Sequence, residues 1–219
     1  MKNKKLYIAA MAGLVAMFAA TSASAFIVNI GGTALVNNGQ VSSVIGAVTT
    51  DFNASLVLPA GYVGGGVKNG SVSGQWASPP DDTSNYFTVG PSTSTPATVS
   101  IGFLASYFGY YGGSPDTYNS ITLLNGESIV KTFTGTELAG FAGVPADGNQ
   151  GVGRYWNIFS ENSGEFFDTV QFTSINNAFE TDNHAVLAAA VPEPETYGMM
   201  LIGIGMLGFM VRRRNNNQV

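Results

Sequence analysis

Cysteine is missing from this chain of 219 residues, and histidine occurs once, as His184. Without cysteine no disulfide can hold the fold, which excludes a small disulfide scaffold and leaves export open. A single histidine excludes a multi-histidine metal site and leaves a histidine-based catalytic triad with one candidate base. We expect His184 to be a surface residue at the end of the last strand instead.

Basic residues are scarce between the two ends of the chain. Only Lys68, Lys131 and Arg154 are basic between residues 26 and 190, where twelve residues are Asp or Glu. Such an acidic surface repels phosphate backbones, so we expect no nucleic-acid partner.

The N-terminus has the three parts of an export signal. Lysines within residues 2–5 precede an apolar run that ends at Ala20, and Ala23-Ser24-Ala25 follows. A basic start, an apolar stretch and a small-x-small site are typical of a secretory signal peptide. We predict that residues 1–25 are a signal peptide, handled by the Sec translocon and cleaved by signal peptidase before Phe26. The alternative is a retained membrane anchor.

The C-terminus also has three parts. Val191-Pro192-Glu193-Pro194-Glu195 is followed by the uncharged segment 196–211, then by Arg212-Arg213-Arg214, and last by residues 215–219, which we expect to be disordered. The prolines lack an amide hydrogen and favour extended backbone before them, so the motif cannot join a following helix.

We predict that segment 196–211 is a transmembrane helix. As a helix it extends roughly 23 Å, and arginine side chains that reach the interface compensate for the difference from the ~30 Å hydrocarbon core. The three arginines place that end in the cytoplasm. The alternative is a buried core helix with a basic tail.

Taken together, this tail resembles the PEP-CTERM sorting signal of Gram-negative bacteria. The resemblance implies an exosortase, a membrane-embedded cysteine protease similar to a transpeptidase, that cleaves near Pro192-Glu193-Pro194. It also implies transient anchoring in the inner membrane, followed by release or transfer to the cell surface or extracellular matrix. On this interpretation the chain is the substrate of the exosortase, and the mature protein ends near Pro194.

Residues 26–190 number about 165, enough for one domain with its own core. Short β-branched and aromatic runs are broken by Gly, Pro, Asn and Ser, which is typical of an all-β sandwich or barrel. The expected strands are 26–30, 41–50, 55–58, 70–76, 86–89, 97–111, 118–124, 127–133, 153–159, 166–174 and 178–187. Residues 136–140 are expected to form a single helical turn.

The pair Asn125-Gly126 predicts a hairpin, because both residues tolerate the positive φ of a two-residue type I′ turn. This turn sets Ile121 opposite Val130 and Thr122 opposite Ile129.

A second resemblance covers the middle of the chain. The run from Tyr107 to Asn119, with Asn125-Gly126, 132–135 and 178–183, is similar to a family of exosortase-dependent surface proteins. Their domain has a Tyr-x-Gly-Ser-x-Asp-x-Tyr-Asn segment and a Phe-Glu-x-Asp-Asn strand before the sorting signal. The resemblance implies a single jelly-roll-like β-sandwich domain and supplies no activity.

Two groups of residues are candidate ligand sites. Acidic clusters carry the oxygen ligands that calcium prefers: Asp81 with Asp82, Asp147 with Asn149, and Glu180 with Asp182 and Asn183. The last cluster is our candidate metal site, and solvated loop acids are the alternative. A glycan platform is the candidate role of Tyr107, Tyr111 and Trp156, since Tyr107 and Tyr111 share a strand face. The alternative for these aromatic residues is core packing.

The sequence offers no catalytic motif, so we expect no enzymatic activity and no cofactor other than calcium. A hydrolase would require paired carboxylates in a cleft, such as Glu161 with Glu165. We predict an exported surface or extracellular-matrix protein, structural or adhesive in an exopolysaccharide or biofilm matrix. The alternative is a glycan- or calcium-binding β-sandwich module displayed at the cell surface.

Overall fold

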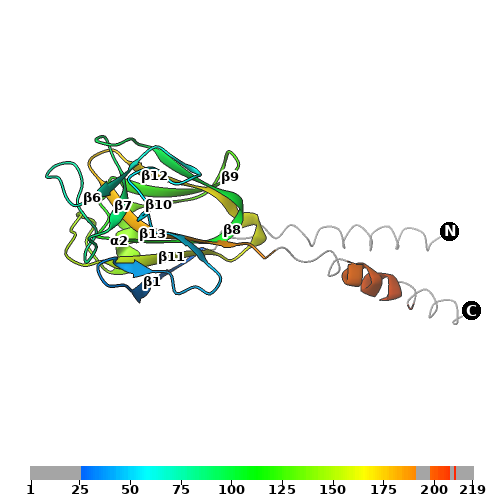
Figure 1. Cartoon of the computed structure of the whole chain (residues 1–219). Helices are drawn as coiled ribbons and strands as arrows, with labels where there is room; N and C mark the ends of the chain where they lie inside the picture. Colours follow the sequence, from blue (N-terminus) through cyan, green and yellow to red (C-terminus); the bar gives the residue numbers. More distant parts are fainter. Residues whose placement is uncertain (1–25, 191–197, 208–209, 211–219) are drawn as a thin grey trace, which may run out of the picture. The chain divides into compact units, whose positions relative to one another are not determined.

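The computed structural model describes residues 26–190, 198–207 and 210 (Figure 1). The chain divides into two units at Ala189, and we describe each by itself. The elements of the first unit are β1 (Phe26–Ile30), β2 (Thr33–Ala34), β3 (Gln40–Val41), β4 (Val48–Thr50), β5 (Tyr62–Val63), β6 (Gly66–Asn69), β7 (Asn85–Val89), β8 (Ala97–Gly112), β9 (Asn119–Asn125), β10 (Ser128–Thr134), α2 (Gly135–Ala142), β11 (Arg154–Ser160), η2 (Ser163–Glu165), β12 (Phe167–Ser174) and β13 (Phe179–Ala188).

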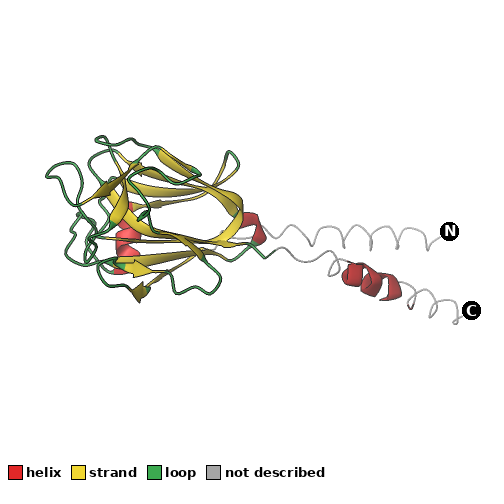
Figure 2. Cartoon of the chain, viewed as in Figure 1, coloured by secondary structure: helices red, strands yellow, loops and turns green. Residues whose placement is uncertain are grey.

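The longest strand, β8, belongs to both layers of a curled antiparallel sheet (Figure 2). Its first half pairs with β12 and β5, and its second half, from Tyr107 onward, pairs with β11 and β13. Between the halves Gly102 has a φ of 82°, which an L-residue with a side chain rarely adopts. The sheet turns over at this position, so its two halves face each other.

The core lies between the two halves and is rich in aromatic rings. Phe172 of β12 packs edge-on against Phe108 of β8, with ring centroids 5.9 Å apart. Tyr110 of β8 stacks on Trp156 of β11 at 5.0 Å, with the rings nearly parallel. The Trp156 indole N–H donates to the Leu138 carbonyl at 2.9 Å, which ties α2 to the core. The prediction of a β-rich domain is confirmed, with its two layers continuous through β8.

Eight of the expected strands are present within a residue or two: β1, β7, β8, β9, β10, β11, β12 and β13. Three expectations were wrong. Segment 41–50 forms strands only at its ends, because a turn with Gly46 at a φ of 83° interrupts it. Segment 55–58 is a loop whose Leu56 and Val57 are 62% and 73% exposed. Segment 70–76 is a loop closed by a single bridge between Val72 and Trp76.

The predicted hairpin exists, but its register differs. Asn125 pairs with Ser128, so the turn residues are Gly126 and Glu127, and only Gly126 has a positive φ. A bulge between Ile129 and Lys131 then sets Ile121 opposite Phe133 and Thr122 opposite Thr132. The expected helical turn at 136–140 is the middle of α2, which begins with a capping box formed by Thr134 and Glu137.

In the second unit, residues 198–207 are helical, and their large apolar side chains are between 53% and 70% exposed. None of the helices in the described part of the chain has the length and apolar character needed to cross a membrane. The signal peptide with Ala23 and Ala25, the motif Val191-Pro192-Glu193-Pro194, the arginines 212–214 and the tail 215–219 lie outside the described residues. The predicted helix 196–211 lies partly outside them and stays a prediction.

Candidate functional site: an acidic pocket beside strand β13

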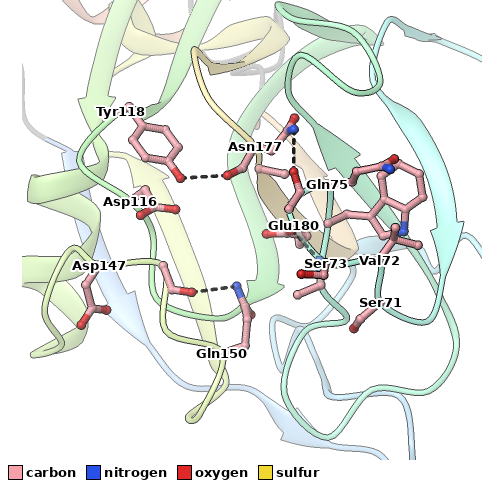
Figure 3. Close-up of a pocket in the computed structure, with 15 residues that line it drawn as sticks. Ser71, Val72, Ser73, Gln75, Asp116, Tyr118, Asp147, Gln150, Asn177 and Glu180 are labelled. Carbon is pink, nitrogen blue, oxygen red and sulfur yellow. Dashed lines mark hydrogen bonds between the residues drawn. The ribbon is translucent and has the colours of Figure 1, made fainter.

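Four segments that are far apart in the sequence build a polar pocket of about 330 Å³ next to the first residues of β13. Figure 3 shows Asp116, Asp147 and Gln150 on one side and residues 71–75 on the other, with Asn177 and Glu180 between them. No Lys or Arg lines the pocket. The pocket therefore presents mainly oxygen atoms and amide groups to a ligand.

Asn177 holds the walls of this pocket together. Its carbonyl oxygen accepts a hydrogen bond from the Tyr118 hydroxyl at 3.0 Å (Figure 3). Its side-chain amide donates to the Gly74 carbonyl at 3.0 Å and to Ser92 Oγ at 2.7 Å. On the opposite wall an isolated β-bridge joins Asp116 to Asp147. Two loops and the start of β13 are thus fixed by direct bonds.

The carboxylates of the pocket are close enough to influence one another. Burial raises the pKa of Glu180 to about 7, although the backbone N–H of Ala77 donates to Glu180 Oε1 at 2.8 Å and opposes this shift. The charge of Asp116 adds to the rise in the Glu180 pKa. Burial also raises the pKa of Asp116, and Asp147 contributes. Near neutral pH Glu180 is therefore partly protonated and both donates and accepts hydrogen bonds.

Trp76 supplies the aromatic surface of the pocket. The Lys68 ammonium lies 4.5 Å from the centre of its ring, within the range of a cation–π contact. The indole Nε1 is buried and has no hydrogen-bond partner among the residues that the structure describes. A ring beside carboxylates and amides offers the stacking and hydrogen bonding that a sugar ring uses.

The three residues of the candidate metal site are divided between two places. Glu180 lines the acidic pocket, whereas Asp182 lies near Ser84 and Asn183 bonds to the loop at residues 38–40. In the described part of the chain, no three or more His, Cys, Asp or Glu side chains converge as a metal site. In the other acidic clusters, Asp81 is exposed, and Asp147 Oδ1 and Asn149 Oδ1 accept backbone N–H groups in turns.

The aromatic residues expected to form a glycan platform are buried. Tyr107, Tyr111 and Trp156 are at most 1% exposed. Trp156 stacks inside the core, whereas Tyr111 lies on the other side of the sheet and donates to the Pro80 carbonyl at 2.6 Å. Loops cover that outer side, so the expected exposed platform was wrong and the alternative of packing holds.

His184 is a core residue, which corrects the expectation of a surface position. It is 2% exposed and stacks on Phe172 with ring centroids 5.1 Å apart. Burial lowers its pKa to about 3, so the ring is neutral near pH 7. No local sequence pattern indicates the β-bulge that turns His184 inward.

The carboxylate pair named for a hydrolase does not converge in the pocket either. Glu161 is exposed, Glu165 is buried, and neither lines the pocket.

A family model for the PEP-CTERM protein-sorting motif matches residues 190–214. The chain carries a PEP-CTERM sorting motif. The match spans the proline–glutamate motif, the apolar segment and the arginines, which confirms the resemblance drawn from these residues. A PEP-CTERM motif makes the chain a target of an exosortase and implies export and targeting to the cell surface. No curated protein and no solved structure matches the chain.

Proposed function

We propose that the chain is an exported, non-enzymatic protein whose β domain is a structural or adhesive component of an exopolysaccharide matrix. The signal peptide directs it through the Sec translocon, and segment 196–211 holds it briefly in the inner membrane. The exosortase then cleaves near Pro192-Glu193-Pro194 and places the domain at the cell surface. The observation that carries the proposal is the PEP-CTERM motif at residues 190–214.

The composition of the β domain supports this role. Its core is held by packed aromatic rings and contains no disulfide, so its stability is independent of the redox state outside the cell. Its surface is acidic, with three basic residues between residues 26 and 190. An acidic surface keeps a protein soluble and hydrated at high local concentration.

Processing is tested by intact-mass measurement of the surface fraction from cells with and without the exosortase. We expect a mature form that begins at Phe26 and ends near Pro194. In cells without the exosortase, and in a Glu193→Ala variant, we expect the form that retains Arg212–Arg214 to accumulate in the membrane fraction. Glu195→Ala, which leaves the Pro-Glu-Pro unit intact, is the matched control. A surface form that keeps the arginines would overturn the proposal.

The acidic pocket favours a second candidate function, binding of a glycan. Carboxylates, amides, the Tyr118 hydroxyl and the Trp76 ring all line a cavity of about 330 Å³. This candidate is tested on a glycan array and by co-sedimentation with purified exopolysaccharide. Tyr118→Phe and Glu180→Gln should weaken the binding several-fold, whereas Glu127→Gln on the exposed hairpin should not. Binding that both pocket variants retain would place the contact elsewhere on the domain.

A further inference from the structure

The bulge in β13 places the neighbouring side chains of Asp182 and Asn183 on the same side of the sheet. Thr181 and His184 bond to each other within the core. The residues between them, Asp182 and Asn183, form the bulge, and Asn183 has a φ of 49°. Both side chains contact the loops that cover the outer side of the sheet, at residues 38–40 and 82–84.

Oxygen atoms from three segments meet at the hydroxyl of Ser84. Ser84 Oγ lies 2.5 Å from Asp82 Oδ1, 2.7 Å from Asn38 Oδ1 and 3.5 Å from Asp182 Oδ2. A serine hydroxyl carries one hydrogen and can satisfy one acceptor. Asp82 Oδ1 also accepts the backbone N–H of Ser84 at 2.8 Å, so Asn38 Oδ1 and Asp182 Oδ2 compete for the one hydroxyl hydrogen.

In the described part of the chain, three more buried oxygens of Asp82, Asp182 and Asn183 have no hydrogen-bond partner. They are Asp82 Oδ2, Asp182 Oδ1 and Asn183 Oδ1. Their side chains are 5% exposed or less. The Asn183 amide is held in place, because its Nδ2 donates to the carbonyls of Asn38 and Gln40 at 2.8 and 3.1 Å. Buried oxygens without partners destabilise a fold, and more so when they are charged.

The groups around these oxygens do not supply a positive charge that would balance the carboxylates. Besides burial, the Asp182 carboxyl is affected by Asp82, through its charge and a side-chain hydrogen bond, by the charge of Asp51, and by the backbone N–H of Asn183. Exchanging the positions of Oδ1 and Nδ2 in the Asn38 amide would add one donor at Ser84. The three oxygens without partners would still have none.

We infer that Asp82, Asp182 and Asn183 form a calcium site, with Ser84 and Asn38 at its edge. The donor set consists of oxygens only, with two carboxylates and an amide, which is the chemistry that calcium selects. Zinc and copper favour nitrogen and sulfur ligands. Magnesium keeps most of its water ligands and fits a buried cluster poorly.

The site ties the first half of β13 to two loops that come much earlier in the sequence. Asn38 and Asp82 are joined by an isolated bridge, and Asp182 and Asn183 belong to β13. A bound cation would cross-link these three segments and stabilise the folded domain. The inference stands apart from the proposed function, although export would bring the site to calcium concentrations at which extracellular modules bind, about 10⁻⁴–10⁻³ M.

The test is thermal unfolding of the purified chain after chelation, with added CaCl₂, MgCl₂ or NaCl at matched ionic strength. With 10 mM calcium we expect Tm to rise by about 3–10 °C. Magnesium should produce a much smaller rise, and sodium none beyond the effect of ionic strength.

The variants Asp182→Asn and Asp82→Asn keep the shape of the side chain and remove one charge. Each should unfold at the wild-type temperature or above it without calcium, and should lose most of the calcium response. Asp81→Asn is the matched control, because Asp81 is exposed and adjacent to Asp82 in the chain. Glu180→Gln controls for calcium in the acidic pocket. Both controls should keep the wild-type response.

The variant Asn183→Asp provides a second, independent test of the site. Aspartate tolerates the positive φ at this position and adds a charge to the cluster. We expect a lower Tm without calcium and a larger calcium-dependent rise than in the wild type. A wild-type chain without a calcium response between pH 6 and pH 9 would overturn the inference in favour of a proton shared by Asp82 and Asp182. A response lost in Glu180→Gln and kept in Asp182→Asn would overturn it too.

Discussion

The phenol oxygen of Tyr62 lies 3.0 Å from Nδ1 of His184 and joins β5 to β13 through the centre of the core. Nε2 of the same ring lies 2.8 Å from Thr181 Oγ1. Both ring nitrogens therefore have hydroxyl partners, which a neutral imidazole satisfies with one donor and one acceptor. The surrounding rings of Phe52, Phe87 and Phe172 exclude water from it.

Because of this environment, we predict that His184 makes the stability of the folded chain sensitive to acid. The pKa of His184 is lowered to about 3 in the folded chain, against about 6.5 when unfolded, so between these values the unfolded chain binds a proton that the folded chain does not. Its contribution is fully present above pH 6.5 and is lost as the pH falls. Relative to His184→Phe, the wild type should lose about 2 kcal/mol of unfolding free energy between pH 7 and pH 5. Urea unfolding at both pH values measures this difference, and identical pH dependence in the two proteins would contradict it.

Glu180 predicts the opposite dependence on pH. Its pKa is raised to about 7 in the folded chain, so the folded chain binds a proton more tightly than the unfolded chain does. The stabilising contribution is present below about pH 4.5 and is lost as the pH rises through 7. Glu180→Gln should therefore be more stable than the wild type at pH 8 by about 1–3 kcal/mol and similar to it at pH 4.5. Glu127→Gln, at an exposed position, should follow the wild type at both pH values.

A third prediction concerns the packing of Gly39 against Tyr111. Gly39 has a φ of 58°, and a Cβ at this position would overlap the Tyr111 ring. Because Tyr111 is buried and bonded to Pro80, the ring cannot move aside. Gly39→Ala should lower the unfolding free energy by more than about 2 kcal/mol. Gly70→Ala, at a φ of 63° with open space around it, should show only the backbone cost of about 1 kcal/mol. Equal losses in denaturant unfolding would contradict the overlap.

The capping box of α2 gives a fourth prediction. Thr134 Oγ1 accepts the backbone N–H of Glu137 at 3.2 Å, and Glu137 Oε2 accepts the backbone N–H of Thr134 at 2.8 Å. Thr134→Ala removes the first bond and should lower the unfolding free energy by about 1 kcal/mol. Thr136→Ala, exposed two residues along the chain, should change it by less than about 0.5 kcal/mol. Chemical denaturation of the two variants checks the difference.

Local patterns in the sequence sufficed for the long strands and for the sorting tail. Alternation around Val99 and the aromatic run after Ala105 identify β8, and the order of prolines, apolar residues and arginines identifies the PEP-CTERM motif. These signals lie within short windows, where side-chain periodicity and backbone preference act directly. The hairpin at Gly126 was found for the same reason, and its register was missed because the turn residues are Gly126 and Glu127 and a bulge beyond them shifts the pairing further.

The candidate site depended on contacts that no local pattern encodes. The β13 bulge moves His184 into the core and leaves Asp182 and Asn183 on the outer side, and alternation along a strand predicts the reverse for one of them. Asp82 and Asp182 are a hundred residues apart, and the fold alone brings them together. Tyr111 is buried because loops at Gly39 and Pro80, which are distant from it in the sequence, pack against its side chain.

The position of β13 has a mechanical consequence for a protein attached through its tail. β13 ends at Ala188, just before the PEP-CTERM motif, and it is flanked by β8 on one edge and by β7 and β4 on the other. A pull on the C-terminus runs along this strand and loads the ladders on both edges at once, in shear. The domain therefore resists unravelling from its C-terminal end.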